Sequence, residues 1–217
     1  MKTAIILLIL VISTNCINQV PQVNGYIESL CPDTRDFIVN SYSVFFNKQD
    51  TDVLARVSLF PFGNSQVNKD TSGKITFDCQ HGPNECYGNR IMTCALNLYE
   101  LRVSHSLIIC LFNQYDSLRP GKITFDDATA KCDSDRAADI LKCANSELGI
   151  ALEVEMANLT PKHTFIPWIL VDGKRDDTEA NAIRANMLKY LCDQRKGEKL
   201  PPCDNSINIE SFLKYLD

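Results

Sequence analysis

After its first residues, the sequence contains no uncharged apolar run of the roughly 20 residues that a membrane-spanning helix requires. Lysine and arginine are not clustered and the formal net charge is −5, so a surface that binds nucleic-acid phosphates is not expected. No Gly/Ser-rich or Pro-rich linker divides the chain, and there is no internal repeat. These absences predict a single domain without a membrane span, long enough to bury a substantial core.

The one long aliphatic run lies at the N-terminus, where Lys2 precedes the apolar residues 4–12 and a short polar stretch ends at Cys16. This is the layout of a secretory signal, and the run is too short to cross a bilayer. We expect residues 1–16 to be cleaved, which leaves residues 17–217 in the oxidising secretory pathway. The alternative is a buried N-terminal strand or helix.

Cysteine is abundant, with ten in the sequence, and nine would remain after cleavage behind Cys16. An odd number in a secreted chain implies one free thiol or an intermolecular bridge. The pairing cannot be deduced from the sequence, but Cys192 and Cys203 are expected to lie close together. Cys86 and Cys94 are expected about two turns apart on one helix, too far to pair with each other.

Hydrophobic periodicity predicts a mixed α/β fold. Strands are expected at residues 20–27, at 53–60 as a buried strand, and at 73–78 within a hairpin or strand pair. Helices are expected at residues 32–46, from residue 83 onward, at 104–113, at 135–148 and at 178–190, where Thr178 is the expected N-cap.

Residues 165–171 are rich in β-formers and contain Pro167, and Asp172-Gly173 after them predicts a hairpin turn. The order of these elements is that of a thioredoxin-like α/β fold with an inserted, disulfide-rich helical subdomain at about residues 79–160.

Residues 79–94 read CQHGPNECYGNRIMTC and concentrate three cysteines, a histidine and a glutamate. This block fits the pattern CQHGxxECxxNxxxxC, through which the chain resembles the gamma-interferon-inducible lysosomal thiol reductase (GILT) family. The resemblance continues at residues 28–32, 61–64, 166–168 and 172–173 and in the tail around Cys192 and Cys203. It implies a thiol oxidoreductase that acts on protein disulfides without a cofactor or a metal.

The resemblance identifies Cys31 as the attacking thiol. A dithiol reductase also needs a second cysteine to resolve the mixed disulfide, and it would stand three positions later, where the chain has Thr34. A hydroxyl forms no disulfide, so a substrate captured by Cys31 would wait for an external thiol. We therefore expect Cys31 to be the free thiol and dithiol turnover to be impaired or lost. The disulfide candidates are then Cys79, Cys86, Cys94, Cys110, Cys132, Cys143, Cys192 and Cys203.

Several neighbours are expected to act on Cys31. The positive end of the following helix favours the thiolate, Thr34 can donate a hydrogen bond to the sulfur, and Asp33 opposes ionisation if its carboxylate lies close. By its resemblance to the thioredoxin-type cis-proline loop, Pro167 is expected to face Cys31 and to help present backbone to an extended substrate. The alternative for Pro167 is an ordinary edge-strand proline.

Three interpretations of His81 and Glu85 remain open. An imidazole and a carboxylate suit acid–base catalysis, but packing and hydrogen bonding inside the disulfide-rich subdomain is the favoured interpretation. A zinc site formed by Cys79, His81, Cys86 and Cys94 is the third. The spacing lacks a C-x₂₋₄-C knuckle and an oxidising compartment favours disulfides, which both argue against zinc.

Asn158 begins the acceptor sequon Asn158-Leu159-Thr160, which predicts a glycosylated loop. Two functions are compatible with the sequence: a thiol oxidoreductase that reacts with disulfide-bonded proteins through Cys31, and a non-catalytic binding protein on the same scaffold. We expect a monomer that is secreted or lysosomal, with Cys31 available for an intermolecular disulfide.

Overall fold

The computed structural model describes residues 20–195 and 200–204. The expected signal peptide at residues 1–16 lies outside these ranges. Within them, no helix has the length and apolar character needed to cross a membrane.

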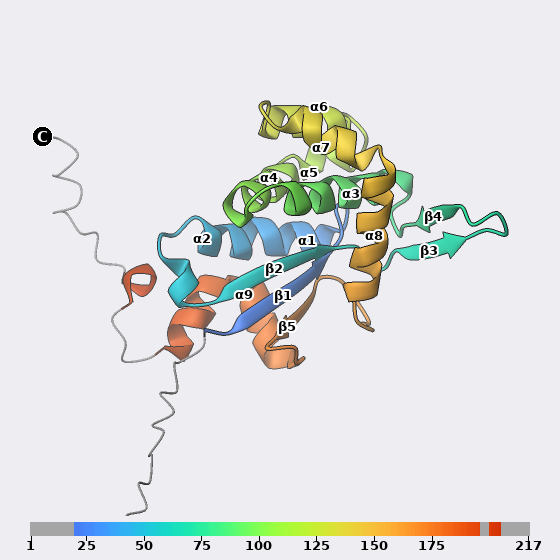
Figure 1. The fold of residues 1–217 in the computed structure, drawn as a ribbon. Coiled ribbons are helices and arrows are strands. Elements are labelled where there is room, and N and C mark those ends of the chain that lie inside the picture. Colours follow the sequence, from blue (N-terminus) through green and yellow to red (C-terminus); the bar gives the residue numbers. More distant parts are fainter. Residues whose placement is uncertain (1–19, 196–199, 205–217) are drawn as a thin grey trace, which may run out of the picture.

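The fold contains a three-stranded sheet with helices above and below it in the view of Figure 1. The central strand β1 (Gln22–Ile27) pairs in parallel with β2 (Arg56–Pro61) and antiparallel with β5 (Trp168–Val171). A parallel pair needs a crossover. Here it consists of α1 (Pro32–Phe37), a π-helical segment (Ile38–Tyr42) and α2 (Ser43–Phe46). The strand expected at 53–60 starts only at Arg56 because a 3₁₀ turn (Thr51–Val53) precedes it, and as an edge strand it is only alternately buried.

The hairpin of β3 (Gln66–Lys69) and β4 (Ile75–Asp78) projects away from the sheet (Figure 1). Between β4 and β5 the chain is helical, and these helices gather on one side of the molecule. They are α3 (Pro83–Leu98), α4 (Leu101–Asn113), α5 (Tyr115–Leu118), α6 (Phe125–Cys132), α7 (Ala137–Ala144) and α8 (Glu147–Leu159). After β5 come α9 (Asp177–Gln194) and a 3₁₀ turn (Pro201–Cys203).

One continuous hydrophobic cluster connects the sheet with the helices. It joins Val23 of β1, Phe37 of α1, Ile91 of α3, Ile108 of α4 and Ile183 of α9, all of which are buried. Burying a side chain of this size stabilises a protein by about 1.5–3 kcal/mol. The helices between β4 and β5 therefore share their core with the sheet.

The hairpin turn expected at Asp172-Gly173 is confirmed: both residues have positive φ, and Val171 and Lys174 exchange backbone hydrogen bonds across the turn at 2.9 Å. Among the described residues the returning strand does not extend beyond this bridge, because α9 starts soon after. The expected N-cap of the last helix is wrong. The N-cap of α9 is Asp176, whose side chain accepts a hydrogen bond from the backbone N–H of Glu179 at 2.9 Å, rather than Thr178. An Asp carboxylate caps the helix N-terminus and also interacts favourably with its dipole, which draws the chain into a helix directly after the turn.

Candidate active site

Cys31 lies at the N-cap of α1, directly after the loop that follows β1. Its backbone is extended, with φ −77° and ψ 125°, and its carbonyl accepts a hydrogen bond from the N–H of Arg35 at 3.0 Å. Pro32 occupies the first helical position, where the missing N–H costs nothing. These local preferences place the sulfur at the positive end of the helix.

The thiol packs against the segment before β5. Its Sγ atom lies 3.7 Å from the carbonyl oxygen of Ile166, and the Ile166–Pro167 peptide bond is cis. Cys31, Tyr26 and Ile166 form a small buried cluster against which Trp168 packs. Only 7% of Cys31 is exposed.

Thr34 is fully buried on the first turn of α1, and its hydroxyl accepts a hydrogen bond from the backbone N–H of Glu28 at 3.4 Å. Burial raises the pKa of the Cys31 thiol. Hydrogen bonds from the N–H and hydroxyl of Thr34 lower that pKa, and the Glu28 carboxylate raises it. Because burial is the largest of these effects, the thiol is less acidic than a free cysteine despite its helix-capping position.

The acidic side chain that opposes ionisation of Cys31 is Glu28, whereas Asp33 affects the thiol through a backbone hydrogen bond that lowers its pKa. The Asp33 side chain is 66% exposed and lies 3.8 Å from the guanidinium of Arg184, so water and a counter-charge screen it. Glu28 is completely buried. The signal for Glu28 was present in the sequence as an acidic residue directly after an apolar strand.

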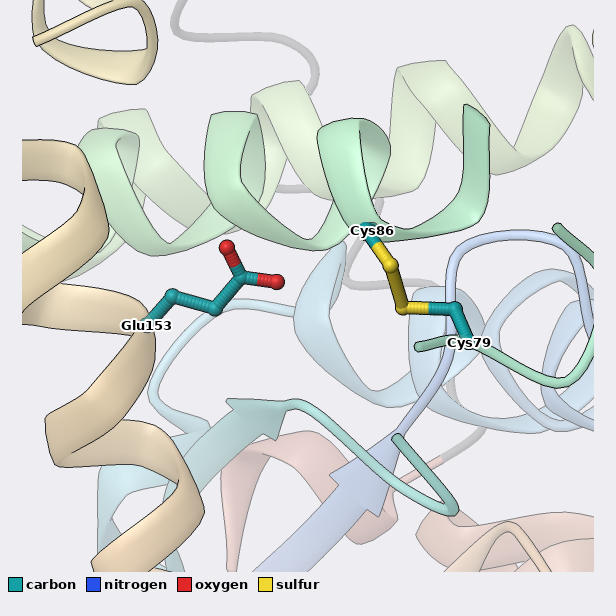
Figure 2. Close-up of side chains that lie close together, drawn as sticks. All are labelled: Cys79, Cys86 and Glu153. Carbon is teal, nitrogen blue, oxygen red and sulfur yellow. A yellow bond between two sulfur atoms is a disulfide. The ribbon is translucent and has the colours of Figure 1, made fainter. Parts of the chain in front are cut away.

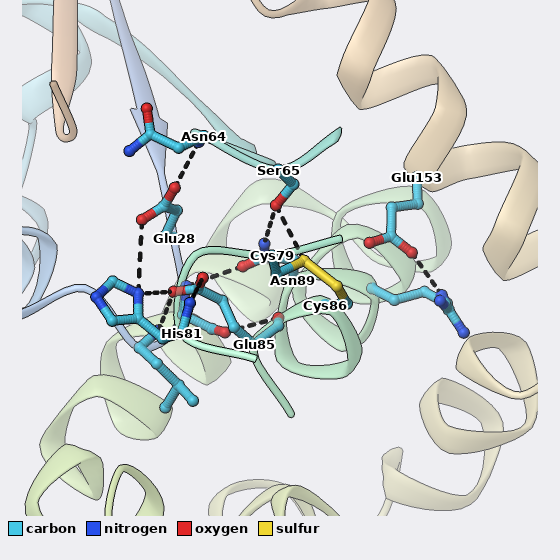
Figure 3. Close-up of a disulfide and its surroundings, with 12 residues drawn as sticks. Glu28, Asn64, Ser65, Cys79, His81, Glu85, Cys86, Asn89 and Glu153 are labelled. Carbon is cyan, nitrogen blue, oxygen red and sulfur yellow. Dashed lines mark hydrogen bonds and ion pairs between the residues drawn. A yellow bond between two sulfur atoms is a disulfide. The ribbon is translucent and has the colours of Figure 1, made fainter. Parts of the chain in front are cut away.

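Glu28 forms a cluster with His81 and Glu85. The Nδ1 atom of His81 lies 2.6 Å from Glu85 Oε2 and 3.9 Å from Glu28 Oε2, and Figure 3 shows both carboxylates facing this nitrogen. Burial and the neighbouring Glu85 raise the pKa of Glu28 to about 7, while hydrogen bonds from Asn64 lower it. The Asn64 N–H donates to Glu28 Oε1.

The cysteine-rich block is in direct contact with the loop that carries Cys31. Asn89 Oδ1 accepts a hydrogen bond from the Ser29 N–H at 2.8 Å, and Glu85 Oε2 accepts one from the Leu30 N–H at 3.3 Å. The Ser29 hydroxyl donates to the Glu85 carbonyl at 3.0 Å. Residues of α3 therefore position the backbone immediately before the thiol.

Eight cysteines form four disulfide bonds, and Cys31 is the free thiol among the described residues. The pairs are Cys79–Cys86, Cys94–Cys143, Cys110–Cys132 and Cys192–Cys203. The zinc hypothesis for Cys79, His81, Cys86 and Cys94 is therefore wrong, because a metal ligand must be a thiolate and these sulfurs are oxidised. Figure 2 shows the Cys79–Cys86 disulfide with Glu153 of α8 nearby.

The two other histidines of the chain form hydrogen bonds within the fold, and the expected glycosylation site lies on a helix. His105 is buried and forms a hydrogen bond between its Nδ1 and the Tyr42 hydroxyl. His163 bridges the Pro161 carbonyl and the Asn64 side chain. Asn158 is exposed, but it lies in the last turn of α8 instead of the expected loop, where the Thr160 hydroxyl already donates to the Met156 carbonyl at 2.8 Å.

Comparison with known proteins gives one matching protein family and several related proteins. The family model described as gamma interferon inducible lysosomal thiol reductase (GILT) matches residues 22–146. A gamma-interferon-inducible lysosomal thiol reductase of Carassius auratus is 32% identical over 85% of this chain and 72% of its own length. A gamma-interferon-responsive lysosomal thiol protein of Arabidopsis thaliana is 29% identical, over 87% and 77%. GILT-like protein 1 of Drosophila melanogaster is 30% identical, over 77% and 72%.

Proposed function

The chain belongs to the gamma-interferon-inducible lysosomal thiol reductase family of thiol oxidoreductases, and from this we propose that it reacts with protein disulfides through Cys31 alone. The observation that carries the proposal is the position of the free Cys31 thiol, at the N-cap of α1 and against the Ile166 carbonyl. The parallel β1–β2 pair, the antiparallel β5 and the α1 crossover suit a thioredoxin-like fold for this site.

The proposed reaction is thiol–disulfide exchange. The Cys31 thiolate attacks one sulfur of a substrate disulfide, a Cys31–substrate disulfide forms, and the other substrate sulfur leaves as a thiolate that takes up a proton. Because Thr34 has no sulfur, an external small thiol must attack the mixed disulfide. A second molecule of that small thiol then reduces the mixed disulfide that remains. In total, two small thiols are oxidised to one disulfide, and the substrate disulfide is reduced to two thiols.

A non-catalytic binding protein on the same scaffold is the second candidate. The burial of Cys31 and its raised pKa favour it, because the thiolate is the nucleophile and its fraction falls about tenfold for each unit by which the pKa rises above ambient pH. A partner would then bind a surface without exchange at Cys31.

One experiment separates the two candidates. The protein is incubated with insulin and a small thiol at acidic and neutral pH, beside Cys31→Ala and Thr34→Cys. We expect the natural chain to reduce insulin faster than Cys31→Ala, and mass spectrometry to find the small thiol or a substrate peptide on Cys31. If Cys31→Ala matches the natural chain while Thr34→Cys alone reduces insulin, the binding protein is the correct function.

We further propose that residues 1–16 are a signal peptide, that residues 17–217 form one domain with a helical insertion at about 79–160, and that the secreted or lysosomal protein carries a glycan on Asn158. The exposure of Asn158 supports the last point. In protein made in a eukaryotic secretory host, N-terminal sequencing tests the signal peptide and glycosidase treatment tests the glycan.

A further inference from the structure

Glu28, His81 and Glu85 bring three potential metal ligands together beside the Cys31 loop. One nitrogen or oxygen atom of each lies within 4.8 Å of the other two. They come from separate parts of the fold: the loop after β1, the loop after β4, and the first turn of α3. Tertiary structure alone therefore creates the cluster.

The cluster is short of positive charge. Both glutamates are completely buried, and among the described residues no lysine or arginine forms an ion pair with either of them. Glu28 Oε2 points toward His81 and accepts no hydrogen bond. A buried carboxylate oxygen without a partner is unfavourable and calls for an explanation, such as a bound ion.

We propose that Glu28 Oε2, His81 Nδ1 and Glu85 Oε2 bind a zinc ion. Histidine nitrogen and glutamate oxygen are both zinc ligands, and three protein ligands leave a fourth tetrahedral position for water. His81 is partly exposed, which leaves a route for the ion and the water. At zinc–ligand bond lengths of about 2.0–2.2 Å, tetrahedral ligands lie roughly 3.4 Å apart, between the 2.6 and 3.9 Å separations of this nitrogen from the two oxygens.

The surrounding hydrogen bonds already orient the ligands. The backbone N–H of His81 donates to Glu85 Oε1 at 2.9 Å, and the backbone N–H of Leu30 donates to Glu85 Oε2 at 3.3 Å. The backbone N–H of Asn64 donates to Glu28 Oε1. An ionised carboxylate has about four lone-pair sites, so these bonds leave room for a metal. Such outer partners commonly fix the geometry of metal ligands.

Zinc at this place would join three segments that meet at the active-site loop. Zinc would bind the imidazole through Nδ1, which leaves Nε2 to carry the ring hydrogen. The site uses no sulfur and leaves the Cys31 thiol unbound, but its ligand Glu28 is also the carboxylate that raises the pKa of that thiol. The neighbouring group of Cys79, Cys86 and Glu153 (Figure 2) cannot serve instead while its two sulfurs form a disulfide.

To test this proposal, the protein is treated with a chelator and titrated with zinc under non-reducing conditions. Isothermal titration calorimetry measures the stoichiometry and the affinity. We expect one equivalent to bind, and Glu28→Gln, His81→Gln and Glu85→Gln each to weaken binding at least as much as the roughly 10–100-fold known for loss of a metal's outer partners. Glu153→Gln is the matched control, since it makes the same substitution at another completely buried glutamate, and it should bind zinc like the natural chain. Cys31→Ala should also bind normally.

Cobalt(II) gives a readout on the natural chain, which does not depend on whether a variant folds. Bound cobalt should show visible d–d absorption without a thiolate charge-transfer band. Absence of zinc binding, a thiolate band, or full binding by folded Glu28→Gln would each overturn the proposal. Loss of binding in Glu153→Gln alone would assign the ion to the other cluster and would equally overturn it.

Discussion

The sulfur of Cys31 lies 3.7 Å from the carbonyl oxygen of Ile166, across a gap of 135 positions in the sequence. This contact places the thiol against the segment that carries Pro167, where a substrate chain could lie beside it. The same packing buries Cys31, and burial raises its pKa. The proposed nucleophile thus lies at a helix N-terminus but has a raised pKa, and the predictions below concern the residues that control this thiol.

Replacing Glu28 by glutamine should make Cys31 more reactive above pH 7. The Glu28 carboxylate raises the pKa of the thiol, and it is ionised above its own pKa of about 7. Its removal should increase the thiolate fraction up to about tenfold, or one pKa unit, and the difference should vanish below pH 7, where Glu28 takes up a proton. The measurement is the rate of iodoacetamide alkylation against pH with a chelator present. Glu153→Gln serves as the control, and equal rates for Glu28→Gln and the natural chain at pH 8 would contradict the prediction.

Asn89→Ala should loosen the loop before Cys31. The variant leaves the buried Ser29 N–H without its acceptor, which costs about 1–3 kcal/mol of unfolding free energy. Amide hydrogen exchange at Ser29 and Leu30 should accelerate. Asn145→Ala, at an exposed asparagine of the same size, should change neither quantity, and unchanged exchange in Asn89→Ala would show that α3 does not hold this loop.

Gly63→Ala should disturb Glu28 directly. Gly63 has φ +56°, and a Cβ atom there would come closer than 3.0 Å to the Glu28 side chain. Gly121 has φ +70° with no atom within 4 Å of such a Cβ, so Gly121→Ala isolates the backbone strain. Denaturant unfolding should show a loss for Gly63→Ala that exceeds the Gly121→Ala loss by roughly 1–3 kcal/mol, the usual cost of overpacking. Equal losses would mean that Glu28 moves aside freely.

His105 should make the protein sensitive to acid. Burial lowers the pKa of His105 to about 4, from an ordinary value of 6.5. The unfolded chain therefore binds the proton more readily, and the stability due to neutral His105 is complete above pH 6.5 and is lost as the pH falls through 4, by up to about 3 kcal/mol. Glu28 and Glu153 act in the opposite direction, because their raised pKa values of about 7 favour the folded state at low pH.

The effect of His105 is measured as the difference between the natural chain and a variant that lacks this histidine. Urea unfolding of His105→Gln and of the natural chain is compared at pH 7 and near pH 4.5, with His163→Gln as a matched control at a less buried histidine. The variant should lose less stability on acidification than the natural chain. Parallel losses in all three proteins would exclude His105 as the cause.

The disulfides should differ in their contribution according to the chain length they enclose. Cys94–Cys143 closes 49 positions and Cys79–Cys86 closes 7. The loop-entropy relation predicts losses of about 4 and about 2 kcal/mol when each pair is replaced by alanine. Calorimetric or urea unfolding of the two double variants measures the difference, and a larger loss for Cys79–Cys86 would point to strain or packing as the dominant effect.

Local elements were predictable because local physics decides them. The helix after Pro32 follows from the fixed φ of proline at the first helical position, and β1 and α4 follow from short-range hydrophobic patterns. The Asp172-Gly173 hairpin turn was also predictable, but the returning strand ends at Lys174. A strand or a helix can follow an Asp-Gly turn, and capping by Asp176 favours the helix.

The spacing of the cysteine block was enough to assign the family. The proposed nucleophile Cys31 and the lack of a thiol at Thr34 could also be read directly from the sequence. Tertiary structure decided the charge around that thiol. Whether Asp33 or Glu28 acts on Cys31 depends on which carboxylate the fold removes from water. Water screens the charge of the exposed Asp33, whereas burial strengthens the interaction of Glu28 with the thiol. Packing of α3 against the loop after β1 likewise gave the cysteine block its second role, as the support of Cys31 through Glu85 and Asn89, which no spacing along the chain could reveal.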